Sequence, residues 1–258
     1  MIKDELGDRI KSNYKNRAKT YLTRRTPVIV RIDGKAFHTL TRKFNKPFDV
    51  VFGETMHNTA LSLCKEISGC VGAYVQSDEI SLLLIDYKTF QTDAWFDYAV
   101  QKVSSVCASL ATMYFNKHFP KLVMSWGKDG EKVSQYFDQN LNILTGCFDA
   151  RCFNIPKEEV ANYFIWRQND ASKNSVQMLA RSLFKHKDIQ GLNLAQLQDK
   201  MVLEKDTNWN DLVVWQKRGV FIKRKEELNN SWVIDYDMPI LSANKDYINE
   251  LTYVGEQR

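Results

Sequence analysis

Residues 28–34 read Val-Ile-Val-Arg-Ile-Asp-Gly, and this stretch decides the fold. β-Branched side chains occupy four of its first five positions, and Pro27 precedes it. Asp33-Gly34 closes the stretch with two residues that favour a turn. We therefore expect a central strand that begins near Val28 and ends at an acidic turn.

The segments that follow alternate between helix-like and strand-like patterns. Apolar residues recur at three- and four-residue spacing in the helical segments, whereas the strand segments are short and rich in β-branched residues. Residues 77–79, Ser-Asp-Glu, separate two strand segments and are expected at the tip of a hairpin. The predicted order of strand, helix, strand, strand, helix and strand covers residues 28–32, 52–67, 73–76, 80–85, 99–114 and 147–155.

This order predicts an α+β fold, an α/β sandwich of the ferredoxin-like type that polymerase palms, nucleotide cyclases and RNA-recognition modules share. We assign residues 1–156 to the palm core with the metal and nucleotide site. Residues 157–258 are assigned to a helical and basic extension with a β-hairpin, packed on that core. The polar stretch 125–140 is the nearest approach to a linker.

The amino-acid composition is compatible with a substantial hydrophobic core and excludes few classes of soluble protein. The chain has 258 residues, 44% of them hydrophobic, and a formal net charge of +5, which permits an acidic partner without requiring one. The five cysteines form no C-x-x-C pair and lie in apolar stretches, which indicates reduced core residues. No apolar run is long enough to cross a bilayer, and residues 1–21 are polar, so we expect a cytoplasmic protein with no membrane partner.

Two acidic turns are expected to meet. In the ferredoxin-like topology the first strand lies beside the hairpin, which brings Asp33 close to Asp78. Carboxylates on adjacent strands suit Mg²⁺, the ion that phosphoryl transfer requires to neutralise a triphosphate. Beyond Asp33, residues 34–38 could turn their amides toward phosphate oxygens, with Lys35 adding charge. The alternative is that both acids belong to ordinary solvated turns.

Six motifs then point to one family. Residues 31–38, Arg-Ile-Asp-Gly-Lys-Ala-Phe-His, resemble the R-[LI]-D-G-x-x-F-H signature of tRNA-His guanylyltransferases. In family order follow segments similar to K-P-N-D, Q-S-D-E-x-S, F-D-[GA]-R, W-R-Q-x-D and a basic K-G element, at residues 46–49, 76–81, 148–151, 166–170 and 217–219. Together they span nearly the whole chain.

The resemblance implies a palm that extends RNA in the 3′-to-5′ direction. The 3′-hydroxyl of an incoming nucleotide would attack an activated 5′ end of tRNA and release pyrophosphate or AMP, with GTP, ATP and other nucleoside triphosphates as substrates. Asp33, the carbonyl of Gly34 and Asp78 would bind two Mg²⁺ ions, with Glu79 beside them as a third catalytic acid. The nucleotide-binding residues implied are Arg31, Gly34, Lys35, Ala36, Phe37, His38, Asp49, Ser77 and Lys102.

Contacts to the acceptor stem and 5′ end of tRNA are expected from a further set, Arg151, Arg167, Asp170, Asn174, Lys217 and Arg218. Plainer interpretations stay open for several of these residues. Arg31 could pair with a neighbouring acid, Lys102 could be a solvated lysine, and His38 a partly buried histidine. The polar stripe that includes Arg167 could be a buried hydrogen-bond network.

One segment departs from the family pattern. Where tRNA-His enzymes carry C-H-I-N-N-L-Y-N, residues 171–178 read Ala-Ser-Lys-Asn-Ser-Val-Gln-Met, and only Asn174 is shared. Ser172 and Lys173 therefore resemble the bacterial and archaeal branch, which repairs 5′-truncated tRNAs against the opposing strand. The alternatives are a strict tRNA-His enzyme, a nucleotide cyclase and a non-catalytic RNA-binding module. Family precedent implies a homotetramer, a dimer of dimers.

Overall fold

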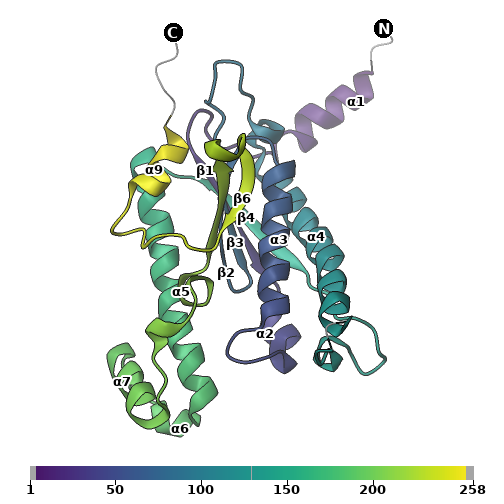
Figure 1. The fold of residues 1–258 in the computed structure, drawn as a ribbon. Coiled ribbons are helices and arrows are strands. Elements are labelled where there is room, and N and C mark those ends of the chain that lie inside the picture. The colour runs from purple at the N-terminus through teal and green to yellow at the C-terminus, as the bar shows by residue number, and fades with distance from the viewer. Residues whose placement is uncertain (1–3, 129, 254–258) are drawn as a thin grey trace.

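The structure is a computed structural model that describes residues 4–128 and 130–253, and it is built around one antiparallel sheet (Figure 1). Six strands of the described residues pair in the order β4-β1-β3-β2-β5-β6. The strands are β1 (Val28–Gly34), β2 (Cys70–Gln76), β3 (Glu79–Leu84), β4 (Phe148–Asn154), β5 (Val220–Lys225) and β6 (Ser231–Asp235). The order β4-β1-β3-β2 of the first four confirms the predicted ferredoxin-like arrangement.

Helices cover both faces of the sheet (Figure 1). They are α1 (Glu5–Ile10), α2 (Phe37–Leu40), α3 (Val50–Glu66), α4 (Val100–Lys128), α5 (Val160–Leu183), α6 (His186–Ile189), α7 (Leu194–Lys205), α8 (Val214–Arg218) and α9 (Asp246–Thr252). The pair α3 and α4 packs on one face, and α5 and α9 lie on the other. The far half of α5 continues past the sheet to α6 and α7, which form a small core of their own.

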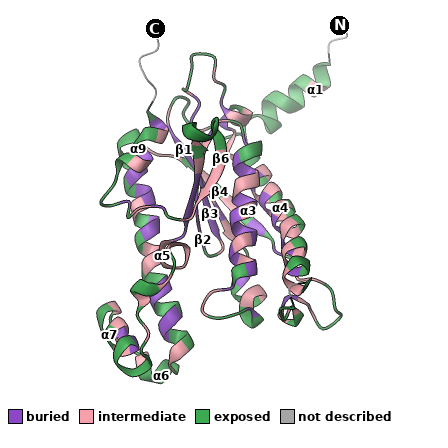
Figure 2. Cartoon of the chain, viewed as in Figure 1, coloured by how far each residue is buried: buried purple, intermediate pink, exposed green. Residues whose placement is uncertain are grey.

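Strand β1 shows why this sequence builds two layers. Val28, Val30 and Ile32 enter the larger core under α3 and α4, while Ile29 enters the smaller core under α5. Because side chains alternate across a strand, Arg31 shares the second face with Ile29. In Figure 2 the central strands and the sheet-facing sides of the helices are buried, whereas the edge strands β4 and β6 are mostly intermediate or exposed and α1 is exposed along its length.

The extension after residue 156 joins the same sheet. The expected C-terminal hairpin is β5–β6, and β5 pairs with β2 from Val75↔Val220 to Gly72↔Lys223. Gly219 makes this approach possible, because its φ is 77° and a Cβ there would lie 2.3 Å from the carbonyl oxygen of Val75. The division at residue 156 stays a prediction.

Two expectations are corrected. The second helix, expected over 99–114, runs on to Lys128 through Pro120, because Phe115, Phe119 and Val123 continue its buried stripe. The proposed linker therefore begins inside this helix. Cys147 is exposed rather than part of the core, since it precedes β4.

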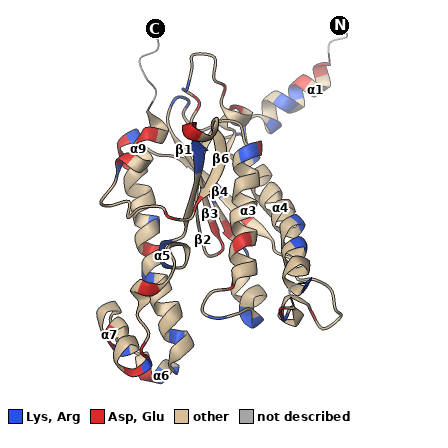
Figure 3. Cartoon of the chain, in the orientation of Figure 1, with Lys and Arg blue, Asp and Glu red and all other residues tan. Residues whose placement is uncertain are grey.

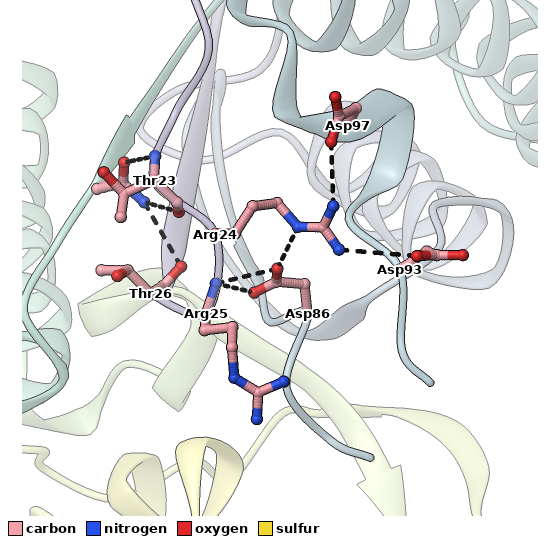
Figure 4. Close-up of polar contacts among 8 residues, drawn as sticks. Thr23, Arg24, Arg25, Thr26, Asp86, Asp93 and Asp97 are labelled. Carbon is pink, nitrogen blue, oxygen red and sulfur yellow. Dashed lines mark hydrogen bonds and ion pairs between the residues drawn. The ribbon is translucent and has the colours of Figure 1, made fainter. Parts of the chain in front are cut away.

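At the end of the sheet away from the β2–β3 turn, the segment before β1 is fastened to the exit of β3 (Figure 4). Asp86 is buried and accepts hydrogen bonds from Arg24 Nε at 2.8 Å and from the amide of Arg25 at 2.8 and 3.0 Å. Arg24 also reaches Asp97 at 3.0 Å. These contacts fix where β1 begins relative to β3.

No helix among the described residues combines the length and apolarity that a membrane span requires. Lys and Arg are mixed with Asp and Glu over the helices, so neither charge is confined to one side of the molecule in Figure 3.

Candidate functional site

Asp33 and Asp78 meet at one end of the sheet. Asp33 is the penultimate residue of β1, and Ser77-Asp78 is the two-residue turn between β2 and β3. The amide of Gly34 donates to the carbonyl oxygen of Asp78 at 3.1 Å, which ties the strand end to the turn. Both acids line a hollow of about 350 Å³, whose other walls include Gly34, Ala36, His38 and Ser77.

The electrostatics of this hollow favour a cation. Burial raises the pKa of Asp78, and the nearby Asp33 and Glu79 raise it further. Arg31 Nη2 lies 3.7 Å from Asp33, whereas no ion pair forms to Asp78 among the described residues. A divalent cation between the two carboxylates would relieve their repulsion, so the residues present fit Mg²⁺.

The protein would supply only part of a metal's coordination shell. No group of three or more His, Cys, Asp or Glu side chains within residues 4–128 and 130–253 is arranged to hold a metal. Two carboxylates would need main-chain, water or triphosphate oxygens to complete the shell, which is how Mg²⁺ is commonly held at phosphoryl-transfer sites.

The loop after Asp33 is held over the hollow by one buried side chain. Phe37 packs against Phe115 and Phe148 with ring centroids 5.3 and 4.9 Å away. Ala36 adopts a left-handed conformation with φ of 57°, and Lys35 and His38 are exposed. Because the Phe37 ring is in the core, only its main chain could contact a triphosphate.

Glu79 does not lie at the hairpin tip. It is the first residue of β3, its side chain is 7% exposed, and it is paired with two arginines. Arg167 donates to both carboxylate oxygens at 2.8 Å, and Arg31 Nη2 lies 2.7 Å from one of them. The structure therefore shows both the Arg31 pairing with an acid and the buried network that the sequence left open as alternatives.

This network extends along α5. Arg167 also donates to Asp170 at 3.1 Å, and its guanidinium lies 4.5 Å from the ring centroid of Trp166. Burial alone would lower the pKa of Arg167, but the charge of Glu79 and its hydrogen bonds raise it. Arg167 therefore stays charged, and its side chain is only 5% exposed.

A second cavity adjoins the hollow. It measures about 270 Å³, lies between α3, the β2–β3 turn, α5 and α8, and shares Ser77 and Phe52 with the hollow. The predicted site residues Asp49, Asn174 and Arg218 line it. Two site candidates that sequence reasoning missed, His57 and Trp215, line it as well. His57 interrupts the apolar stripe of α3, which was the available signal.

Asp49 already has structural partners. It caps α3 by accepting from the amide of Phe52 at 2.8 Å, and its other oxygen accepts from the amide of Asn45 and the hydroxyl of Tyr136 at 2.9 Å each. Contact with a base would have to use the remaining lone pair on the capping oxygen.

Three predicted site residues, Lys102, Arg151 and Lys217, do not line the hollow around the acidic pair. Lys102 is on the first turns of α4, 4.4 Å from the ring centroid of Phe96. The hydroxyl of Thr112 accepts a hydrogen bond from the amide of Phe148, the residue that pairs with Gly34. Thr112 follows Lys102 by ten residues, or about 15 Å along the helix axis, so Lys102 lies well away from the end of β1. Arg151 is exposed on β4, and Lys217 donates to the carbonyl oxygen of Asn210 at 2.6 Å.

Comparison with known proteins gives a consistent result. The profile of the tRNAHis guanylyltransferase (Thg1) family matches residues 8–156. A structure titled a bacterial tRNA(His) guanylyltransferase (Thg1)-like protein in complex with ATP aligns with a TM-score of 0.83 and 42% identity over 96% of this chain and all of that chain. A GTP complex under the same title aligns at 0.77 and 38%, with the same coverage. An uncharacterized mimivirus protein, R259, is 31% identical over 96% of this chain and 87% of its own length.

Proposed function

We propose, because this chain belongs to the tRNAHis guanylyltransferase family of nucleotidyltransferases, that it adds nucleotides to the 5′ end of tRNA in the 3′-to-5′ direction. The observation that carries the proposal is that Asp33 and Asp78 line the same hollow, beside a loop of main-chain amides at the end of β1. Mg²⁺ held there would neutralise the triphosphate and lower the pKa of the attacking hydroxyl.

The chain's own groups have separable tasks in this proposal. The main chain of residues 34–38 and Ser77 receive the triphosphate of the incoming nucleotide, with His38 and Lys35 beside it. The adjoining cavity, with Asp49 on its wall, receives the base. ATP and GTP are the proposed substrates, in keeping with the two nucleotide complexes among similar structures.

The reaction replaces a phosphoanhydride bond at the activated 5′ end of the tRNA with a phosphodiester bond. The 3′-hydroxyl oxygen of the incoming nucleotide bonds to the α-phosphorus of the activated tRNA, the phosphorus that is esterified to the 5′-oxygen. Pyrophosphate leaves from a 5′-triphosphate, or AMP leaves from a 5′ end that ATP has adenylylated. The hydroxyl proton passes to solvent or a bound base.

Template-dependent repair is the form of this activity that we favour. Ser172 and Lys173 replace the residues that tRNA-His enzymes carry, and they lie on α5 beside Ala171 and Asn174, which line the second cavity. If the protein does not choose the nucleotide by recognising one tRNA, pairing with the opposing 3′ strand can choose it. Stems of A-form RNA are read by shape and backbone, since side chains cannot enter the deep major groove.

The test supplies Mg²⁺, ATP and all four nucleotides to 5′-truncated tRNAs that carry each of the four templating bases. Addition of the complementary nucleotide to tRNAs of several identities supports repair. Guanine added only to tRNA-His, whatever the template, would establish the strict enzyme instead. Formation of cyclic nucleotide, or RNA binding without turnover, would overturn the proposal. A homotetramer and a cytoplasmic location belong to the same proposal.

A further inference from the structure

The α5 face of the sheet is left open over its edge strand, β4. Asp149, Arg151 and Phe153 of β4 pair in register with Asp33, Arg31 and Ile29 of β1, so the two rows share one face. Ile29 is fully buried, whereas the Arg151 side chain is 79% exposed and Phe153 is 37% exposed. The cover that α5 gives to β1 does not extend over β4.

A row of aromatic rings borders this open face. The ring of Phe153 lies 5.9 Å from that of Tyr163, which lies 5.8 Å from that of Trp166. Tyr163 is buried and its hydroxyl is within 2.8 Å of Ser81 Oγ, so the middle ring is fixed. Trp166 is 53% exposed at the other end of the row. The row is therefore a rigid base with two exposed rings.

Positive charge lies between this row and the acidic pair. Arg31 and Arg151 are cross-strand neighbours, and Arg31 Nε is buried without a hydrogen-bond partner among the described residues. The cross-strand pairs Asp33↔Asp149 and Ile29↔Phe153 are four residues, or about 13 Å, apart along the strands. The Arg31–Arg151 pair thus lies between the proposed reaction centre and Phe153.

We propose that this open face, formed by Arg31, Arg151, Phe153 and Trp166, binds unpaired nucleotides of the RNA substrate by stacking their bases on Phe153 and Trp166. Single exposed aromatics are common and need no explanation, but exposed rings on a rigid support beside arginines are the combination that single-stranded RNA requires. Arg31 is paired with Glu79 at 2.7 Å, whereas Arg151, 3.8 Å from Asp149, keeps its side chain 79% exposed. Paired nucleotides would not fit this role, because their bases are already stacked within the stem. The inference rests on the proposed function for the choice of RNA.

The test measures binding of a labelled single-stranded hexaribonucleotide, with a blunt duplex of the same sequence as comparison. Trp166→Ala and Phe153→Ala are each expected to weaken single-strand binding roughly tenfold, the loss of about one stacked base. Trp166→Phe should restore most of the affinity. Arg151→Gln should reduce the salt slope by about one. Phe90→Ala removes an exposed aromatic from the loop after β3 and should change nothing.

Unchanged single-strand affinity in both alanine variants would overturn the proposal. So would an altered oligomeric state in size-exclusion chromatography with unaltered RNA affinity, because the face would then be an interface between copies of this chain. Asp78→Asn separates the two proposals, since it should abolish nucleotide addition and leave hexaribonucleotide binding intact. If the wild type never extends tRNA but the aromatic variants still lose single-strand affinity, the proposed function fails and the binding surface stands.

Discussion

Glu79 is either a structural acid that holds Arg167 or a catalytic acid, and the substitution Glu79→Gln distinguishes the two roles. A structural role predicts a loss of stability, and a catalytic role predicts a loss of turnover without it. In the structure the Glu79 carboxylate accepts two hydrogen bonds from Arg167 at 2.8 Å and is 2.7 Å from Arg31, with its side chain 7% exposed. The substitution would leave two guanidinium groups facing a neutral amide. Removing one partner of a buried ion pair costs about 3–5 kcal/mol, so we expect a loss of unfolding free energy in that range.

Arg167→Met should lower the free energy of unfolding by less than Glu79→Gln does. Glu79 would keep Arg31 as a partner, so what is lost is the bidentate contact rather than all charge compensation. Hydrogen bonds to charged groups contribute about 1.5–3 kcal/mol, and we expect a loss of that size. The double variant should be less destabilised than the sum of the two, because each single change removes the same interaction.

The assay is urea unfolding followed by far-ultraviolet circular dichroism, with nucleotide addition measured on the same preparations. Asp170→Asn is the matched control: it removes another acid 3.1 Å from Arg167, but one that is 41% exposed, and should cost less than about 1 kcal/mol. If Glu79→Gln retains wild-type stability within about 1 kcal/mol and still abolishes turnover, Glu79 is a catalytic acid and the structural reasoning is wrong.

Three further predictions concern the acidic pair and the loop beside it. Asp33→Ala and Asp78→Ala should each abolish nucleotide addition with the fold intact by circular dichroism, and the double variant should be hardly worse; near wild-type turnover in either would refute the metal assignment. Because burial and Asp33 raise the folded-state pKa of Asp78, its stabilising contribution is present below the unfolded pKa and is lost as pH rises through the folded one. Without metal, Asp78→Asn should therefore raise the melting temperature at pH 7 and leave it unchanged near pH 3; an equal shift at both would contradict this. Gly34→Ala should weaken triphosphate binding in a nucleotide titration, because its Cβ would lie 2.4 Å from the Phe37 ring and displace the loop; wild-type affinity would show that the loop tolerates the shift.

The fold was largely predictable because its signals are local. The β-branched run of β1, the stripe of α3 and the turn between β2 and β3 each lie within a few residues, and the ferredoxin-like order follows from them. The attachment of β5 to β2 was not predictable. It depends on the close approach of Gly219 to Val75, two residues that lie far apart in the chain.

The site was predictable only in part, for the same reason. Acids that end strands are visible in the sequence, and topology then brings Asp33 and Asp78 together. The partners of Glu79 come from β1 and from α5, and Arg167 is 88 residues away in the chain. No local pattern distinguishes such a buried arginine from one that contacts RNA. The roles of the individual site residues stay predictions.

The pairing of β1 with β3 has a consequence for how this protein can vary in length. Cross-strand pairs run without interruption from Val28↔Leu84 to Asp33↔Glu79, and Asp86 anchors the ladder at its far end. One residue inserted within β1 would exchange its two faces, placing Arg31 in the apolar core and Ile32 beside the reaction centre. Homologues should therefore tolerate insertions and deletions in the exposed turn at residues 139–142, but keep the spacing of residues 28–34 unchanged.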